Sequence, residues 1–273
     1  MGKRSEAMKE LHIVSISGGK DSAALAIYLK EKYPNRKFKY LFFDTGEELS
    51  DTYEYLNRLE GILGEKIEYI KPKKSFDELL KEHNEFLPSA KQRWCTRKMK
   101  IEPFLEEMKK YKDYQIYNYV GIRADEDRNA LIPPFENIKT IMPFKEDDIT
   151  LNDVKRILFE SELGLPKYYE EVYDEKFDIK YNRSRSGCYF CFFMRQIEWV
   201  WLYEKHPELF KKAMSYEKEG FSWIEGMPLS ELIRKIDEIK LKYKKMKKEP
   251  KNKTLAESIE KFETDDFCTM CAL

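Results

Sequence analysis

The stretch HIVSISGGKDSAALAIYL, residues 12–29, decides the fold of this chain. Its first five residues, His12–Ile16, are largely apolar and β-branched, as expected for a buried parallel strand. The alanine-rich segment Ser22–Lys32 predicts a helix that ends before Pro34. Between them stand two glycines, a lysine and two hydroxyl groups. A tight turn accounts for the glycines alone, whereas the full set suits a phosphate, since glycine admits a close backbone approach and a helix N-terminus favours an anion.

Strands and helices alternate over the first half of the chain. Further strands are predicted at Lys39–Phe43, Ile67–Ile70 and Gln115–Ile122, and helices after Thr45-Gly46, over Ser75–His83 and from about Glu102 to Lys112. This alternation predicts an α/β fold with an open, mostly parallel twisted sheet and helices on both faces. In such sheets ligands bind at the carboxyl ends of the strands. Three polar clusters follow strand ends here, namely Ser17–Ser22, Asp44-Thr45-Gly46 and Gly121–Arg128.

From about Thr150 the sequence becomes helical and aromatic-rich, without clear strands. We therefore predict two domains, a nucleotide-binding α/β domain over residues 1–150 and a mainly helical, cysteine-bearing C-terminal region over residues 151–273. The boundary is expected near residues 145–165.

The overall charge is balanced, with Lys+Arg 50 and Asp+Glu 50, so it argues neither for nor against a nucleic-acid partner. Segment 239–253, IKLKYKKMKKEPKNK, carries eight lysines and one glutamate. A solvated helix end is the commoner explanation for such a run, and a polyanion-binding patch is the alternative. No apolar run is long enough to span a bilayer, and no signal-peptide core precedes the glycines, so we expect a cytoplasmic protein without a membrane partner.

Four of the five cysteines form two C-x-x-C pairs, Cys188 with Cys191 and Cys268 with Cys271. Small buried side chains would explain single cysteines, but two such pairs in a cytoplasmic protein favour metal or redox chemistry. Four thiolates suit a tetrahedral Zn²⁺ ion or a [4Fe–4S] cluster, and the aromatic surroundings favour the cluster slightly. Cys95 is open to three roles: core thiol, sulfur carrier, or third cluster ligand beside Cys188 and Cys191, which would leave the terminal pair as a redox dithiol.

The motif SGGKDS after a first strand resembles the PP-loop of the ATP-pyrophosphatase superfamily. It differs from a Walker A motif, because Asp21 stands where Ser or Thr should follow the lysine, and it lacks the third glycine of the dinucleotide fingerprint. The wider chain resembles the phosphoadenosine phosphosulfate (PAPS) reductase-like branch. FFDTGEELSDTYEYL, RWCTRKMKIEPF and GIRADEDR follow in the expected order, and the resemblance covers roughly residues 11–145.

This resemblance implies an adenine nucleotide alpha hydrolase-like fold with ATP and Mg²⁺ as cofactors. The residues implied to bind the nucleotide are Ser17, Gly18, Gly19, Lys20, Asp21, Ser22, Asp44, Thr45, Gly121 and Arg123, with Asp44 as a candidate partner of Mg²⁺. The candidate catalytic residues are Lys20, Asp21, Asp44, Arg123 and Cys95. Asp125 and Glu126 would either face a metal or orient the neighbouring arginines.

A cluster of cations around one tryptophan suits an anionic substrate. The candidate substrate-binding residues are Arg93, Trp94, Arg97, Lys98 and Arg128. Packing in the core is the commoner role for a tryptophan.

The leading functional hypothesis is an enzyme in which ATP adenylates a substrate oxygen with release of pyrophosphate, and sulfur then displaces AMP. The acceptor would be a nucleic acid or a small molecule, with a sulfur donor protein or a reductant as partner, and a homodimer remains open. One alternative is thiol- or cluster-dependent reduction of PAPS or adenosine phosphosulfate to sulfite, with Cys268 or Cys271 as nucleophile. The intact loop and the two-cysteine tail DDFCTMCAL both depart from the usual reductases. The other alternative is a non-catalytic nucleotide-sensing or partner-docking domain.

Overall fold

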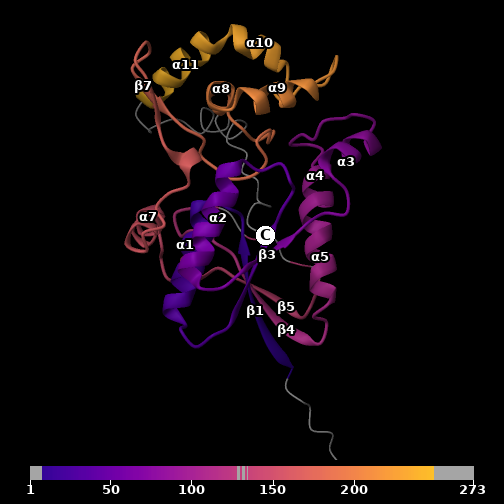
Figure 1. Ribbon diagram of the computed structural model, residues 1–273, viewed down its shortest axis with the longest axis vertical. Helices are drawn as coiled ribbons and strands as arrows, with labels where there is room; N and C mark the ends of the chain where they lie inside the picture. The colour runs from indigo at the N-terminus through magenta and orange to yellow at the C-terminus, as the bar shows by residue number, and fades with distance from the viewer. Residues whose placement is uncertain (1–7, 128–129, 131–132, 134, 249–273) are drawn as a thin grey trace, which may run out of the picture. The chain divides into compact units, whose positions relative to one another are not determined.

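The computed structural model describes residues 8–127, 130, 133 and 135–248 (Figure 1). These residues form two compact units. The first comprises residues 8–73 and the described part of 96–166, and the second comprises residues 74–95 and 167–248. Residues 74–95, which lie inside the predicted 1–150 domain, therefore group with the second unit.

The first unit is built on a five-stranded sheet with the order β3-β2-β1-β4-β5, in which every neighbouring pair is parallel. Its strands are β1 (Lys9–Ile16), β2 (Phe38–Phe43), β3 (Ile67–Ile70), β4 (Tyr114–Tyr119) and β5 (Ile138–Ile141). The predicted α/β class and parallel sheet are confirmed. Strand β5 was not predicted, because IKTI is short and has only two strongly apolar residues.

Helices cover both faces of this sheet (Figure 1). The helices of the first unit are α1 (Lys20–Lys32), α2 (Ser50–Leu63), the π-helix η1 (Arg97–Ile101), α5 (Glu102–Lys109), α6 (Pro143–Glu146) and α7 (Leu151–Glu160). Apolar residues of α1, α2 and α7 form one core with Val14 and Phe42 of the sheet. On the opposite face, α5 packs Phe104 against Phe43 with ring centroids 5.7 Å apart. Sequential residues of β1 and β2 therefore point into different cores, which explains their uninterrupted apolar composition.

The second unit is mainly helical, as predicted, but it also contains an antiparallel hairpin. Its elements are α3 (Phe76–Glu82), the 3-10 helix η2 (Lys167–Tyr169), β6 (Val172–Asp174), β7 (Ile179–Tyr181), α8 (Gln196–Lys205), α9 (Pro207–Ser215), α10 (Leu229–Arg234) and α11 (Ile236–Lys248). The short helix α4 (Trp94–Thr96) contains the boundary at which the chain returns to the first unit. The expectation of no strands after Thr150 was wrong. Each hairpin strand has only three residues, too few for a two-residue periodicity to be visible in the sequence.

The basic segment on α11 serves in part to hold the second unit together. Lys240 is 5% exposed, and its ammonium group lies 2.6 Å from carboxylates of both Asp174 and Glu204. Lys244 and Lys247 donate to the carbonyl oxygens of Phe177 and Lys180, 2.7 Å away in each case. Three lysines of this run, for which a solvated helix end was expected and a polyanion patch was the alternative, thus bind the hairpin or α8. Residues 249–253 lie outside the described part of the chain.

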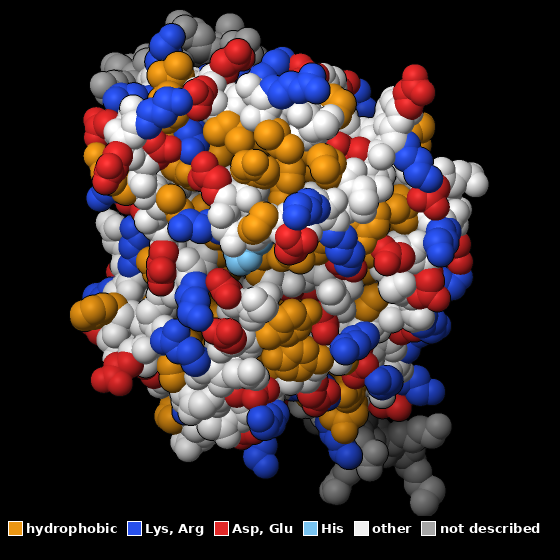
Figure 2. All heavy atoms as spheres, turned by 45° about the horizontal axis from the view of Figure 1, so that its top comes forward, with side chains coloured by type: hydrophobic (Ala, Val, Ile, Leu, Met, Phe, Trp, Pro, Cys, Tyr) orange, Lys and Arg blue, Asp and Glu red, His pale blue; other side chains and the backbone are white. Residues whose placement is uncertain are grey.

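The surface mixes charges of both signs. In the view of Figure 2, Lys and Arg side chains alternate with Asp and Glu side chains, and apolar patches lie between them. Over the described residues, no helix is both long enough and apolar enough to cross a membrane.

Candidate functional site

The strand order places one candidate site at the centre of the sheet. Strand β1 lies between β2 and β4, so the chain leaves β1 in one direction and returns on its other side. Such a reversal opens a crevice at the carboxyl ends of the two central strands. The Ser17–Ser22 loop follows β1 and the Gly121–Asp127 segment follows β4, so both border this position.

The loop has a fixed backbone shape that depends on Gly18. This residue has φ of +72°, and a Cβ atom added to it would overlap the Cγ2 methyl of Thr52 on α2. Ser22 closes the loop: its hydroxyl donates to the carbonyl of Gly19 at 3.1 Å and accepts from the backbone N–H of Ser17 at 3.0 Å. Helix α1 begins at Lys20, and no side chain caps its N-terminus. The positive end of the helix dipole therefore points into the loop.

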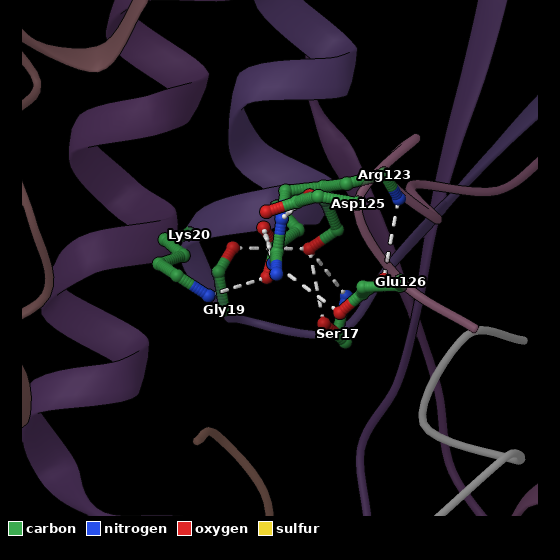
Figure 3. Close-up of polar contacts among 8 residues, drawn as sticks. Ser17, Gly19, Lys20, Arg123, Asp125 and Glu126 are labelled. Atoms are coloured by element: carbon green, nitrogen blue, oxygen red, sulfur yellow. Dashed lines mark hydrogen bonds and ion pairs between the residues drawn. The ribbon is translucent and has the colours of Figure 1, made fainter. Parts of the chain in front are cut away.

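The segment after β4 packs directly on this loop. A Cβ atom at Gly121 would lie 2.9 Å from the carbonyl oxygen of Asp21, so only glycine permits this approach. Two residues later, Arg123 crosses over the loop and donates from Nη1 to Asp21 Oδ1 at 2.8 Å (Figure 3). Asp21 also accepts from Lys20 Nζ at 2.7 Å. One carboxylate thus holds both cations of the site.

Two more carboxylates complete the cluster around Arg123. Its Nε donates to Asp125 at 2.8 Å, and its Nη1 lies 3.2 Å from Glu126. Both acidic residues contact the arginine, as the second of the two roles considered for them requires. Burial opposes the charged form of Arg123, but the charge and hydrogen bond of Asp21 outweigh it and raise the pKa of the guanidinium.

The turn after β2 contains a second cluster of buried polar groups. Asp44 is 4% exposed, and its Oδ1 accepts from the backbone N–H of Gly46 at 2.9 Å and from the Tyr53 hydroxyl at 2.7 Å. Thr45 donates to Glu48 at 2.8 Å. Burial raises the pKa of Glu48 to about 7, although the positive charge of Lys100 lowers it. Asp44 and Thr45 therefore shape this turn through their own contacts.

Lys100 lies on η1, the π-helix that follows Cys95 in the sequence. π-Helical turns often occur at functional sites, since the extra residue moves side chains out of the regular helical register. On the same element, Lys98 lies 3.0 Å and Arg97 3.4 Å from a carboxylate oxygen of Glu102. These two predicted substrate-binding cations thus share an acidic partner within the first unit.

Five other predicted site residues lie in the described part of the second unit, namely Arg93, Trp94, Cys95, Cys188 and Cys191. Trp94 is 8% exposed, stacks on Phe76 and His83, and donates from Nε1 to the Phe86 carbonyl at 3.0 Å. These are core contacts. Arg93 lies over the ring of Phe193, 4.9 Å from its centroid, which brings the segment before Cys95 against the segment after Cys191.

Cys95, Cys188 and Cys191 are half-buried thiols of this unit. Within residues 8–127 and 135–248 no three His, Cys, Asp or Glu side chains are placed to hold a metal, so the three-cysteine cluster gains no support. Arg128, Cys268 and Cys271 lie outside the described residues.

Comparison with protein families agrees with the fold and with the loop. Residues 11–175 match the model of the phosphoadenosine phosphosulfate reductase domain. The chain belongs to this family. The match begins within β1 and ends after β6, so it contains the loop, the turn after β2 and the Arg123 segment. The PAPS reductase-like resemblance predicted from SGGKDS and its companion motifs is confirmed.

The descriptions of two similar proteins name no activity. Two proteins of Methanocaldococcus jannaschii, both described as uncharacterized, MJ0973 and MJ0066, are 29% and 28% identical to this chain and match 84% and 80% of it. The chain spans about half of their lengths, 55% and 45%. Among solved structures, the phosphate complex of PAPS reductase from Candida auris is 15% identical, with a TM-score of 0.47 over 64% of this chain and 85% of that one.

Several residues of these clusters were missed at the sequence level. Glu48 and Tyr53 lie within the motif FFDTGEELSDTYEYL but were not singled out as site residues. Their hydrogen bonds with Thr45 and Asp44 mark them in the structure. Arg183 was not singled out either. It is fully buried and donates to four backbone carbonyl groups of residues 185–189, in the loop that carries the first cysteine pair.

Proposed function

We propose that the first unit binds the phosphates of ATP and uses them to adenylate a substrate oxygen, with release of pyrophosphate. The observation that carries this proposal is the convergence of Lys20, Arg123 and the uncapped start of α1 on one glycine-shaped loop. Each of these features stabilises phosphate oxygens. The same groups would stabilise the charge that develops on the leaving pyrophosphate.

The charges of the loop support Mg²⁺ as the companion of the nucleotide. Lys20 and Arg123 supply two positive charges, while Asp21, Asp125 and Glu126 supply three negative ones. A free triphosphate would meet net repulsion here. Its Mg²⁺ complex carries less negative charge and provides a cation for the carboxylates. Asp44 is a poorer Mg²⁺ ligand than its position suggests, because its Oδ1 already accepts two hydrogen bonds.

The thiols of the second unit fit a metal as one half of a site. The backbone N–H of Cys191 donates to the carbonyl of Cys188 at 3.1 Å, which closes the C-x-x-C segment into a turn and keeps both thiols on one short loop. This is the donor type that zinc and iron–sulfur clusters take. We propose that Cys268 and Cys271 supply the other two ligands. The bound group would either fix the tail or deliver sulfur to the adenylated substrate.

Nucleotide binding and chemistry can be tested separately. We expect the purified chain to bind MgATP in isothermal titration calorimetry, and Lys20→Met to weaken that binding at least tenfold. We also expect incorporation of labelled pyrophosphate into ATP when candidate acceptors, tRNA first, are added. Lys32→Met is the matched control, since Lys32 lies at the other end of the same helix. Equal MgATP affinity in the wild-type and Lys20→Met proteins would contradict the proposal.

A second candidate function is the reduction of a phosphosulfate nucleotide, and the family match favours it. The decisive comparison is between ligands. A chain that binds PAPS but not MgATP, and that releases sulfite with a thiol donor, is a reductase. A chain that binds MgATP and forms no sulfite is not.

A further inference from the structure

The turn after β2 lies at the same level of the sheet as the Ser17–Ser22 loop. In the parallel register of β1 and β2, Ile16 pairs with Phe42, so the loop and the turn leave neighbouring strands side by side. Helix α2 follows the turn and brings Thr52 against Gly18, where an added Cβ atom would lie 2.4 Å from the Thr52 Cγ2 methyl. A charge buried in this turn therefore acts on a phosphate group bound at the loop.

One hydroxyl group of α2 joins two buried carboxyl groups of this turn. Asp44 and Glu48 are 4% and 8% exposed. The Tyr53 hydroxyl lies 2.7 Å from Asp44 Oδ1 and 3.4 Å from Glu48 Oε2. A hydroxyl group has one proton and can donate it to only one of these oxygens. The shorter distance favours donation to Asp44, so the second contact is a good hydrogen bond only when Glu48 carries a proton and donates it to Tyr53.

The other oxygen of Glu48 already has a donor. Oε1 accepts from the Thr45 hydroxyl at 2.8 Å, which leaves Oε2 to hold the proton. The resulting chain of donors runs from Glu48 to Tyr53 and from Tyr53 to Asp44. When Glu48 is ionised, two buried carboxylates compete for the single Tyr53 proton and repel each other. The geometry of the turn therefore favours the neutral form of Glu48.

The charged groups around Glu48 come from its own turn, from η1 and from the segment after β3. Burial raises the pKa of Glu48 to about 7, against the positive charge of Lys100 on η1. Asp44 and Glu47 of the same turn are both buried and add negative charge. Lys71 approaches Asp44 Oδ2 to 3.8 Å, but its side chain is 74% exposed, so solvent and salt screen it. Glu48 therefore changes its charge near neutral pH.

We propose that Glu48 makes nucleotide binding at the Ser17–Ser22 loop proton-linked, so that the protein binds MgATP more tightly when Glu48 carries its proton. This inference rests on the MgATP site of the proposed function. MgATP keeps two negative charges, and an ionised Glu48 repels them. By linkage, the bound nucleotide favours the protonated form of Glu48 to the same extent, so binding takes up protons from the solvent and release returns them.

The size of the effect follows from Coulomb's law. For a doubly charged nucleotide about 10 Å from the Glu48 charge, with the dielectric constant of water, repulsion weakens binding roughly fourfold. The lower effective dielectric constant near a protein surface extends this to about tenfold. Such a preference corresponds, at pH 7, to the uptake of about a third of a proton per nucleotide bound.

The test is calorimetric titration of the full chain with MgATP in excess Mg²⁺, between pH 6 and 8.5 and in buffers of different ionisation enthalpy. The dependence of the heat on the buffer gives the number of protons taken up. Glu48→Gln keeps the size and the neutral charge of the protonated residue. Glu107→Gln is the matched control, because Glu107 is 5% exposed and lies near the end of α5 that leads to the amino end of β4, whereas the loop follows the carboxyl end of β1.

We expect the wild type to bind MgATP about three- to sevenfold more weakly at pH 8.5 than at pH 6, with uptake of about a third of a proton at pH 7. Glu48→Gln should keep the wild-type affinity of pH 6 over the whole range and take up no proton, and Glu107→Gln should behave as the wild type. Should Glu48→Gln not fold, Glu48→Ala removes the same titrating group.

Two results overturn the role of Glu48 and leave the MgATP site intact. One is a wild-type affinity that does not change with pH, and the other is proton uptake that persists when Glu48 is replaced. A wild-type chain that binds no MgATP at any pH overturns the proposed function itself.

Discussion

The shape of the phosphate loop depends on Gly18 for two separable reasons, and substitutions can measure each. Gly18→Ala must adopt φ of +72° and must also place a methyl group against Thr52. Gly64→Ala imposes the left-handed backbone conformation without a steric overlap, since Gly64 has φ of +67° and its Cβ would have nothing within 4 Å. Gly121→Ala imposes only close contact, because its Cβ would lie 2.9 Å from the Asp21 carbonyl oxygen and its φ is not in the left-handed region.

The expected losses follow from these environments. A left-handed alanine costs about 1–2 kcal/mol, so Gly64→Ala should lower the free energy of unfolding by that amount. Overpacking costs about 1–3 kcal/mol, which sets the value for Gly121→Ala. Gly18→Ala combines both burdens and should lose about 2–5 kcal/mol. Thr52 cannot easily yield, since it is 1% exposed and β-branched residues on helices have stiff side chains.

Urea unfolding of the three variants, together with calorimetric titration of MgATP, provides the assay. Thr52→Ser removes the Cγ2 methyl that opposes Gly18, so the double variant Gly18→Ala/Thr52→Ser should recover the contact part of the loss and keep the dihedral part. We expect Gly121→Ala and Gly18→Ala to weaken MgATP binding and Gly64→Ala to leave it unchanged. The reasoning is refuted if Gly18→Ala loses no more stability than Gly64→Ala, or if Thr52→Ser fails to relieve it.

Three further predictions concern charged groups. Burial raises the pKa of Glu48 from an ordinary 4.5 to about 7, so the native state holds this proton more tightly than the unfolded state does. The free energy of unfolding should therefore fall as pH rises between these values, by on the order of 1–3 kcal/mol. Urea unfolding across pH 4–8 should show this decline in the wild type and a flatter profile in Glu48→Gln. Lys240→Met leaves Asp174 and Glu204 without their shared cation and should lower the free energy of unfolding by about 2–4 kcal/mol. Lys242→Met, on the exposed side of α11, should lower it by under about 0.5 kcal/mol. Equal losses would show that the buried network contributes nothing to stability. Asp21→Asn removes the carboxylate that Lys20 and Arg123 share, so calorimetry without Mg²⁺ should show about tenfold higher affinity for pyrophosphate. Asp147→Asn removes the partner of Lys32 at the far end of α1 and should leave the affinity for pyrophosphate unchanged.

Local patterns were enough to predict four of the five strands of the sheet in the first unit. Buried parallel strands need apolar residues on both faces, and β1 and β2 show this directly in LHIVSI and FKYLFF. The helix expected over Ser75–His83 is present as α3, and a capping box begins it, with the Ser75 side chain accepting from the Glu78 backbone N–H. Strand β5 and the hairpin β6–β7 were missed because their sequences are short and their pairing partners, rather than their composition, make them strands.

The candidate site was only partly predictable, for a related reason. Motif spacing identified Gly18, Lys20 and Asp21, because a phosphate loop is contiguous in sequence. The partners of these residues come from other strands. Whether Arg123 pairs with Asp21 or points away depends on the strand order, and whether Lys240 faces a polyanion or Asp174 depends on how α11 docks on the hairpin. Long-range contacts of this kind carry no local sequence signal.

The charges around Arg123 indicate what the phosphate loop requires of its ligand. Arg123 is surrounded by Asp21, Asp125 and Glu126, so the phosphate loop is already neutralised and should accept an anion only with a cation beside it. This arrangement favours a metal–nucleotide complex over a free phosphate. If pyrophosphate without Mg²⁺ binds to the wild-type loop as tightly as to Asp21→Asn, this argument is contradicted.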